Sequence, residues 1–310
     1  MLFSRRQFSA QLAAGLSITG LSITGLATAV SPLCAADPTD EAADKTVDKT
    51  LQQPLRVLTY NIYAGKGWPS ERAQAIQAFA AGHMPRRLAR ELALYRADII
   101  NFSESPSQEF TEEVAEHLGM NHVRFPSGGN WPGTLLSRFE IADSQNVPLA
   151  GQRPQELFTR HWGRATLKLP AGDPLIVHSA HLFPVADPTV RLQEVSAMLT
   201  SMKTDLDARR SMLLIGDLNH TPDSQEYQRW MDAGWIDTFT KAGEGDGLTF
   251  RSDTPEKRID YILAAGPIAA QSVTCRQLFE GDFRLHMDDQ DSFALSDHLP
   301  VLAVFDLKKN

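Results

Sequence analysis

Apolar residues recur with two different periods from residue 55 onward. Residues 55–60 and 98–102 are short runs rich in strand-forming side chains, and each has the length of one strand. Between them, Leu88, Leu92 and Tyr95 recur at the spacing of one helix face. The pattern predicts a strand, a helix and a second strand at the start of this region.

The same two periods continue to the end of the chain. Helical spacing recurs at Phe110, Val114 and Leu118, and again at Leu192, Val195, Leu199, Met202 and Leu206. Further strands are predicted at residues 174–177, 212–215, 258–263 and 300–305. Helices and strands are therefore expected to alternate throughout one α/β domain, residues 55–310, with polar residues placed directly after several strands.

The first 36 residues have a different character. Arg5 and Arg6 precede a stretch without charged residues that ends in small residues at Ala36, which is typical of a cleaved signal peptide. Residues 4–8 resemble the twin-arginine export signal. An uncleaved membrane anchor and a lipid anchor on Cys34 are the alternatives. We expect an exported protein, periplasmic or secreted.

Residues 37–54 are polar and acidic, lack a hydrophobic period, and are expected to form a disordered tether. Loss of residues 1–36 removes Arg5 and Arg6 and no acid, which changes the net charge from -8 to -10. This acidic balance argues against binding of nucleic acid through general basic charge. Cys34 and Cys275 offer no pair for a disulfide in the mature chain, so the fold has to be held by its core, for which a 42% hydrophobic composition is sufficient.

Six clusters of polar residues follow or begin predicted strands. A polar side chain that directly follows an apolar run lies at a sheet edge, partly exposed and held by the strand. Each cluster alone is a weak signal, because Asn, Glu and Asp at such places are often turn formers or helix caps. The clusters are residues 60–62, 101–104, 178–182, 216–219, 258–262 and 296–300.

In this order the six clusters resemble the endonuclease/exonuclease/phosphatase family of metal-dependent phosphoesterases, which includes nucleases, inositol polyphosphate phosphatases and sphingomyelinases. Residues 216–219 (Gly-Asp-Leu-Asn) and 296–298 (Ser-Asp-His) are the most specific parts, and residues 134–139 also look like a family strand. The resemblance implies a four-layer α-β-β-α sandwich of two mostly antiparallel sheets flanked by helices, with all six clusters at one rim. Ser103 stands where the family usually has Gln before the metal-binding Glu.

Hydrolysis of a phosphoester requires a centre that stabilises negative charge on phosphoryl oxygens and activates a water molecule. Glu104 and Asn61 offer the oxygen ligands that Mg²⁺ or Mn²⁺ prefers, and Asp297 is a third candidate ligand. No thiol or Ser/His pattern indicates a covalent route.

The remaining roles follow from the resemblance. It implies that His298 is the general base, that Asp260 holds its ring, that Asp217 orients the attacking water, and that Asn219 donates to the phosphate.

Two histidines compete for a further role at the phosphate. His178 and His181 are three residues apart and point to opposite faces of an extended strand, so only one can serve. The sequence around His181 resembles the phosphatases and sphingomyelinases, and that around His178 resembles DNase I. We favour His181. Six other histidines are expected at the surface or in the ordinary core: His83, His117, His122, His161, His220 and His286.

The substrate is the least determined part of this hypothesis. Residues 280–291 are rich in acids and would repel duplex DNA, so a small-molecule or lipid head-group phosphoester is favoured. A membrane lipid would require an exposed aromatic hairpin, for which residues 128–132 and 67–69 are the candidates. The alternatives are a secreted DNase I-like endonuclease and, in another class, a non-catalytic phosphate-binding module. The sequence implies no protein partner.

Overall fold

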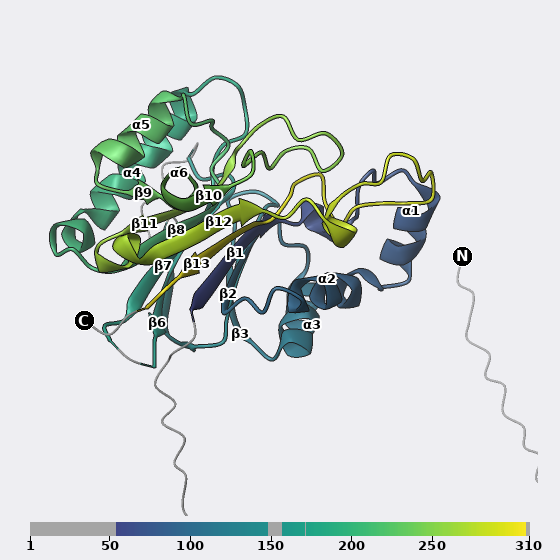
Figure 1. Cartoon of the computed structure of the whole chain (residues 1–310), viewed down its shortest axis with the longest axis horizontal. Coiled ribbons are helices and arrows are strands. Elements are labelled where there is room, and N and C mark those ends of the chain that lie inside the picture. Colours follow the sequence, from purple (N-terminus) through teal and green to yellow (C-terminus); the bar gives the residue numbers. More distant parts are fainter. Residues whose placement is uncertain (1–53, 148–156, 171, 308–310) are drawn as a thin grey trace, which may run out of the picture. The chain divides into compact units, whose positions relative to one another are not determined.

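The structure is a computed structural model that describes residues 54–147, 157–170 and 172–307 (Figure 1). The predicted signal peptide, residues 1–36, and the predicted tether, apart from Pro54, lie outside the described residues. The helices are α1 (Ala73–Ala80), α2 (Met84–Ala93), α3 (Gln108–Leu118), α4 (Thr189–Asp207), α5 (Gln225–Asp232) and α6 (Thr238–Ala242), with short 3-10 turns at Tyr63–Gly65, Pro267–Gln271 and Gly281–Phe283.

The strands form two sheets. The first sheet contains β1 (Leu55–Asn61), β2 (Ile99–Ser103), β3 (Asn121–Phe125), β4 (Gly133–Ser137), β10 (Gly243–Glu244), β12 (Ser272–Gln277) and β13 (Val301–Phe305), in the order β10-β12-β13-β1-β2-β4-β3. The second contains β5 (Glu140–Asn146), β6 (His161–Lys168), β7 (Leu175–His181), β8 (Met212–Asp217), β9 (Ile236–Asp237) and β11 (Asp260–Ala265), in the order β5-β6-β7-β8-β11-β9. Most neighbouring strands are antiparallel; the exceptions are β1–β2, β10–β12 and β7–β8.

The two sheets pack face to face through one set of alternating side chains. Val57 of β1 and Ile99 of β2 point toward the second sheet, where they join Val177 of β7 and Ile215 of β8 in a buried cluster. The next residue of β1, Leu58, points to the opposite face and belongs to a different cluster. This alternation follows from the two-residue period of a strand, and it gives each sheet two buried faces.

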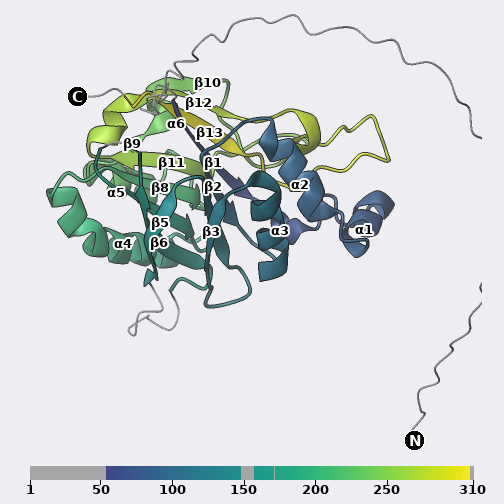
Figure 2. The ribbon, with the colours of Figure 1, turned by 90° about the horizontal axis from the view of Figure 1, so that it is seen from below.

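Helices cover both outer faces (Figures 1 and 2). Leu88 and Leu92 of α2 and Val114 of α3 pack on the outer face of the first sheet, while Met198 of α4 and Trp230 of α5 pack on that of the second sheet. The arrangement confirms the predicted four-layer sandwich.

The predicted regular alternation of helices and strands is wrong between residues 121 and 181. There the described residues, 121–147, 157–170 and 172–181, form β3 to β7 and no helix, with β3–β4, β5–β6 and β6–β7 as antiparallel pairs. The pattern misses β5 because this strand lies at the edge of its sheet, where most of its side chains are exposed and polar.

Cys275 is buried in β12 as a free thiol. Within residues 54–147, 157–170 and 172–307, no helix has both the length and the apolar character required to cross a bilayer.

Candidate active site

Six strand ends meet at one edge of the sandwich. Asn61 ends β1, His181 ends β7 and Asp217 ends β8, whereas the antiparallel strand β11 begins at the same edge with Asp260. Backbone pairing places Asp217 opposite both His181 and Asp260. Glu104 directly follows β2, and the 296–298 segment directly precedes β13. The topology therefore brings all eight predicted site residues to this edge.

A buried hydrogen-bonded group lies at its centre. The Nδ1 of His298 is 2.9 Å from Oδ2 of Asp260, and its Nε2 is 3.8 Å from Oδ2 of Asp217. The amide of Asn61 donates to the same Asp217 oxygen at 3.1 Å and lies 3.5 Å from Nε2 of His298. The ring of His298 is thus held by a carboxylate on one nitrogen, while its other nitrogen faces the remaining polar residues.

The backbone around Asp217 is set by close packing of β8 against β7. Gly216 has a φ of 147°, and a Cβ there would lie 1.8 Å from the carbonyl oxygen of Ala180. Glycine is therefore the residue that fits, and it lets Asp217 approach His181, whose Nε2 is 3.5 Å from Oδ2 of Asp217. The other oxygen of Asp217 accepts from the backbone N–H of Asn219 at 3.1 Å.

The electrostatic balance at this edge is strongly negative. Burial and then the neighbouring Asp260 raise the pKa of Asp217. Burial alone would lower the pKa of His298, but the carboxylates of Asp260, Asp217 and Asp297 outweigh it and raise that pKa to about 10. Burial also raises the pKa of Glu104. Four carboxylates meet at this edge against the cationic groups of His298 and Arg160, so a further cation would stabilise their ionised forms.

Glu104 has a backbone conformation that side chains seldom adopt. Its φ is 54°, in the left-handed region, directly after β2. Residues held in this region cluster at functional sites, where surrounding structure compensates for the strain. Backbone hydrogen bonds fix the segment, because Ala64 donates to the carbonyl of Glu104 at 3.0 Å and Ser105 donates to that of Pro132 at 2.9 Å.

The donor set fits a hard divalent cation. Oxygen-rich sites with several carboxylates suit Mg²⁺ or Mn²⁺, and the buried Oδ1 of Asp260 has no hydrogen-bond partner among the described residues. Ligand atoms of Asp217, Asp260 and His298 lie within 4.8 Å of one another and form one possible chelating group. In this group Nδ1 of His298 already lies 2.9 Å from Oδ2 of Asp260. Glu104 and Asn61, predicted as ligands from the sequence, lie at the same edge of the sheets.

Asp297 precedes β13 and Asn219 follows β8 at this edge. Ser296 donates to the backbone carbonyl of Asn61 at 2.7 Å, which ties the segment before β13 to the end of β1. Asp297 follows and contacts the Ser296 hydroxyl at 3.3 Å. The Asn219 amide donates one of its two N–H groups to the carbonyl of Leu182 at 3.0 Å, which holds the side chain at this edge.

The two competing histidines have different environments. His181 lines the cleft at this edge. His178 lies on the opposite face of β7, where the indole of Trp162 donates to its Nδ1 at 3.3 Å. The structure therefore brings His181 and not His178 to the site. Four of the other histidines are exposed, as expected, but His220 is buried and lines the cleft, and the buried ring of His161 lies 6.3 Å from that of His181.

A cleft of about 740 Å³ runs from this centre toward α5. Glu104, His181, Asp217 and His298 line one end. Its far end is lined mainly by polar side chains of residues 219–226 and by residues 184–188. A volume of this size is typical of a site for a small molecule.

Comparison with known proteins identifies the fold family. The sequence matches the Endonuclease/Exonuclease/phosphatase family over residues 58–298. The chain belongs to this family. Family members are hydrolases that include phosphatases and phosphodiesterases. A comparison with curated proteins gives no match.

Solved structures of family members have the same fold. A family protein from Bacteroides thetaiotaomicron has a TM-score of 0.65 and 18% identity, over 82% of this chain and 100% of that one. A mannosyl-6-phosphatase from the same organism has a TM-score of 0.63 and 17% identity, over 80% of this chain and 98% of that one. A truncated TDP2 from Caenorhabditis elegans has a TM-score of 0.60 and 14% identity, over 82% and 98%. At such low identity the similarity establishes the fold alone.

This member of the Endonuclease/Exonuclease/phosphatase family has further residues at the site that the sequence did not reveal. Phe250 stacks near His298, with ring centroids 5.0 Å apart, and lines the cleft together with Lys257. Both belong to a loop whose strand-like contacts, Phe250 with Lys257 and with His298, are isolated bridges. No periodic pattern marks such a loop, so its place at the site emerges only from the fold.

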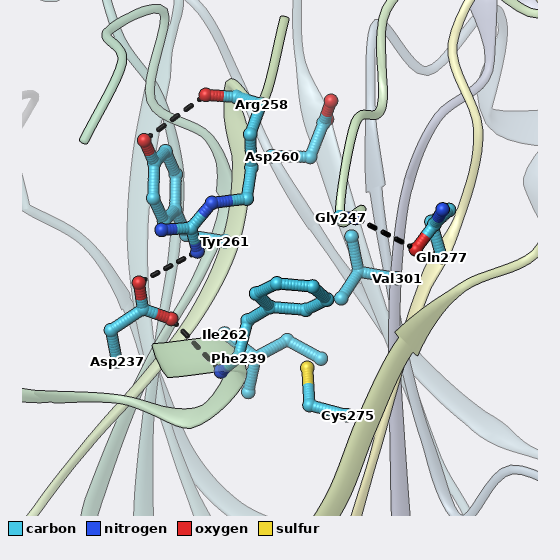
Figure 3. Close-up of a pocket in the computed structure, with 10 residues that line it drawn as sticks. All are labelled: Asp237, Phe239, Gly247, Arg258, Asp260, Tyr261, Ile262, Cys275, Gln277 and Val301. Carbon is cyan, nitrogen blue, oxygen red and sulfur yellow. Dashed lines mark hydrogen bonds and ion pairs between the residues drawn. The ribbon is translucent and has the colours of Figure 1, made fainter. Parts of the chain in front are cut away.

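A second, much smaller pocket lies behind Asp260 (Figure 3). Its volume is about 10 Å³, which is room for roughly one water molecule. Arg258 forms a buried ion pair with Asp237 at 2.6 Å, and its backbone carbonyl accepts from the hydroxyl of Tyr261 at 3.1 Å. These contacts hold the start of β11 and so support the position of Asp260.

Two aromatic segments suggested as membrane contacts are not freely exposed. Trp68 and Trp131 are each partly buried, and each is covered by a guanidinium group. Arg251 lies over the ring of Trp68 at 5.1 Å, and Arg160 lies over that of Trp131 at 4.1 Å. Each ring is therefore only partly exposed, and whether either segment contacts a membrane stays a prediction.

Proposed function

We propose that this family member is a divalent-metal-dependent phosphoesterase that hydrolyses small phosphoester substrates. The observation that carries the proposal is the cleft of about 740 Å³, which ends on Glu104, Asp217 and His298. Its size suits a small molecule, and its charged end has the residue types that phosphoryl transfer requires.

The metal ligands and the general base of the proposed reaction are different residues of the chain. A cation held by Glu104 and Asn61, with Asp297 beside them, would supply positive charge for the phosphoryl oxygens. His298 accepts the proton of the attacking water through Nε2 once that nitrogen is neutral, and Asp260 holds the ring through Nδ1. Positive charge beside the carboxylates favours this neutral form.

Three further residues act on the water and the phosphate. Asp217 orients the attacking water from its place beside Nε2 of His298. His181 and Asn219 donate to phosphoryl oxygens, His181 from the end of β7 and Asn219 from the loop after β8. The oxygen of the leaving alcohol takes a proton from solvent water as the P–O bond breaks, the oxygen of the attacking water remains on phosphorus, and His298 returns its proton to solvent.

The polar lining favours a hydroxyl-rich substrate. Thr221, Asp223 and Gln225 line the far end of the cleft and can pair with hydroxyl groups, while Lys257 supplies positive charge nearby. The structurally similar mannosyl-6-phosphatase gives a phosphosugar as a precedent within the fold. A sugar phosphate is therefore the first substrate class to test, followed by lipid head-group esters.

Duplex DNA is the less favoured substrate. Part of the acidic segment is neutralised, because Asp282 pairs with Arg87 at 2.7 Å and Glu280 pairs with Arg276 at 3.0 Å. Asp288, Asp289 and Asp291 remain exposed in the same segment. The negative charge that remains would still weaken binding of a long polyanion.

A panel of phosphoesters tests the activity. Sugar phosphates, lipid head-group esters and duplex DNA are incubated with the purified domain and Mg²⁺, Mn²⁺, Ca²⁺ or chelator, and released phosphate or cleaved strands are measured. Hydrolysis of small esters that chelator abolishes supports the proposal. Rapid cleavage of duplex DNA alone would assign the protein to the endonucleases, and phosphate binding without turnover would assign it to the binding modules.

Export through a twin-arginine signal belongs to the same proposal. Replacement of Arg5 and Arg6 by Lys is expected to leave a folded, active precursor inside the cell, because this route depends on the arginine pair. Cell fractionation and activity assays measure the distribution. Unchanged export of the double variant would refute this part and leave the enzymatic part intact.

A further inference from the structure

A buried ion pair lies at the far end of the cleft, and the mechanism above gives it no role. Nε of Arg191 donates to Oε1 of Glu226 at 2.8 Å, and the two side chains are only 6% and 2% exposed. Arg191 belongs to the first turn of α4 and Glu226 to the first turn of α5, and both residues line the cleft. A buried ion pair adds little net stability, because both charges lose their hydration. The pair therefore matters chiefly for the segments that it connects.

The first of these segments is the wall of the cleft formed by residues 184–188. Nη1 of Arg191 donates to the carbonyl of Phe183 at 3.0 Å and also to that of Val185. Most of the wall is exposed, and it has no helix or strand. It also contains two prolines, which lack a backbone N–H with which to hold a shape. The guanidinium of Arg191 therefore fixes where this wall lies.

The start of the wall is held separately, by another charged residue of α4. Oε2 of Glu194 accepts from the backbone N–H of Phe183 at 2.9 Å, and Oε1 accepts from that of Phe158 at 2.6 Å. These bonds do not involve Arg191. Loss of Arg191 would thus release the wall while Glu194 still holds the backbone just after β7.

The opposite wall, at the start of α5, has its own anchors. Ser224 caps the helix by accepting from the backbone N–H of Tyr227 at 3.1 Å, and Trp230 is fully buried against α4 and the second sheet. Arg229 donates to the carbonyl of Leu192 at 3.1 Å, which is a second link between the two helices. This wall is therefore fixed, and the ion pair sets how far the 184–188 wall stands from it.

The two walls differ in chemistry. Val185 and Ala186 give the first wall apolar groups, whereas Thr221, Asp223 and Gln225 give the second wall polar ones. A sugar ring carries C–H groups on its faces and hydroxyl groups at its edge, so it can contact both walls at once. Such contacts require a fixed separation between the walls.

We propose that the Arg191–Glu226 pair sets the width of the far end of the cleft and thereby selects phosphoesters whose leaving alcohol is a single sugar ring over those with a bulkier alcohol. The inference rests on the proposed phosphoesterase function. Arg191 is a positioning residue here, because it acts through the wall that it holds. A planar guanidinium presents donors in several fixed directions, so it reaches one carboxylate and two carbonyls at once.

The test compares three variants with the wild-type protein in Mg²⁺. Arg191→Met combined with Glu226→Gln removes both charges together, so that no buried charge is left alone. Arg191→Lys keeps the charge without the planar fork. The control combines Arg164→Met with Asp205→Asn, an ion pair that joins β6 to the other end of α4 and does not line the cleft. Circular dichroism and thermal melts establish that each variant is folded.

Two substrates of different size measure the selection. Glucose 6-phosphate and trehalose 6-phosphate carry the same phosphorylated carbon on one sugar ring and on two, and kcat and KM are determined for both. Hydrogen exchange of the backbone amides in residues 183–187 and calorimetric binding of both sugar phosphates add readouts that require no turnover.

We expect the wild-type protein to favour glucose 6-phosphate in kcat/KM. In the double variant this preference should fall about tenfold through a higher KM for glucose 6-phosphate, with kcat changed less than about threefold, because the reacting end is intact. Exchange in residues 183–187 should become faster, and Arg191→Lys should give intermediate values. The control should change the preference less than about twofold, because its pair lies away from the cleft.

A folded double variant with the wild-type preference and the wild-type exchange rates would show that the inference is wrong. An equal loss of kcat/KM for both esters, or a wild-type protein that favours trehalose 6-phosphate, would overturn it as well. If the wild-type protein turns over no ester of the panel, the proposed function fails instead. Hydrogen exchange and calorimetry then still decide whether the pair holds the wall and selects the smaller sugar phosphate.

Discussion

Buried histidines differ in charge state between two regions of this molecule. At the site edge, His298 is buried among Asp260, Asp217 and Asp297, and its pKa is raised to about 10 against the effect of burial. Inside the second sheet, burial lowers the pKa of His161 and of His178 to about 3. The extent of burial is similar, so the carboxylate neighbours decide whether a histidine carries charge.

The contrast shows how the fold separates histidines that pack in the core from a histidine that can transfer a proton. His161 bonds to the hydroxyl of Ser179 at 2.9 Å and His178 to the indole of Trp162, and both of these partners are neutral. Such histidines fill the core as polar but uncharged groups. His298 instead lies where four strands bring carboxylates together, and that charge makes it useful for moving a proton.

Removal of the carboxylate nearest to the proposed cation should have the largest effect. Glu104→Gln keeps the shape of the side chain but removes its charge, so we expect activity to fall about 10³-fold or more because charge stabilisation by the cation is lost. Turnover in saturating Mg²⁺ is measured. Glu112→Gln, on the exposed face of α3, is the control and should keep full activity. Full turnover by Glu104→Gln in chelator would contradict the assignment.

Substitution of the charged histidine and of its partner carboxylate should reduce kcat to different extents. His298→Ala removes the proposed base and should reduce kcat about 10²- to 10⁴-fold. Asp260→Asn leaves the base but loosens its ring, so a smaller reduction is expected. Steady-state kinetics measures both, with the exposed His286→Ala as control. Equal activity of His298→Ala and the wild type would remove His298 from the mechanism.

The neutral histidines should affect stability in acid. Their folded-state pKa of about 3 lies below the ordinary value of 6.5, so the unfolded chain binds more protons between these values. The contribution of these histidines to the free energy of unfolding is therefore fully present above about pH 6.5. It decreases as the pH falls, by up to about 1.4 kcal/mol per histidine for each pH unit. His178→Gln should make the decline from pH 6 to pH 5 shallower by about 1 kcal/mol, measured by urea unfolding. An unchanged slope would mean that His178 is not buried in its neutral form.

Substitution of the partner of a neutral histidine should lower stability and leave activity nearly unchanged. Ser179→Ala removes the hydroxyl between His161 and Asn101, which leaves buried polar atoms without their bond. We expect the free energy of unfolding to fall by about 1–3 kcal/mol with kcat nearly unchanged. Ser201→Ala, at an exposed position of α4, serves as the control. A large loss of kcat in folded Ser179→Ala would instead show that this polar chain acts on the site.

The sequence predicted the strands whose side chains are mainly buried. Residues 55–60 and 212–215 correspond to β1 and β8, because central strands with two covered faces are continuous apolar runs. It did not predict β6, which the pattern missed among mixed residues such as His161, Trp162 and Arg164. A side chain there can face the other sheet or a helix, and the local sequence does not distinguish these neighbours.

The site was predictable where function and strand position coincide. Asn61, Asp217 and Asp260 each lie at a strand terminus, so order along the chain and resemblance to the family placed them at one edge. Arg160 and Phe250 were missed, because their contacts arise from loops that fold against other loops. Such contacts depend on tertiary structure and leave no periodic signal.

Gly216 limits which parts of this site can change by mutation. Because a side chain there would collide with the carbonyl of Ala180, a substitution has to separate β8 from β7, and Asp217 would move with β8. Changes in substrate preference by mutation are therefore expected to accumulate in the segments that line the far end of the cleft, residues 184–188 and 220–226, while the strand that presents Asp217 stays fixed. Engineering of a new substrate preference should diversify those two segments and leave residues 216, 217 and 219 unchanged.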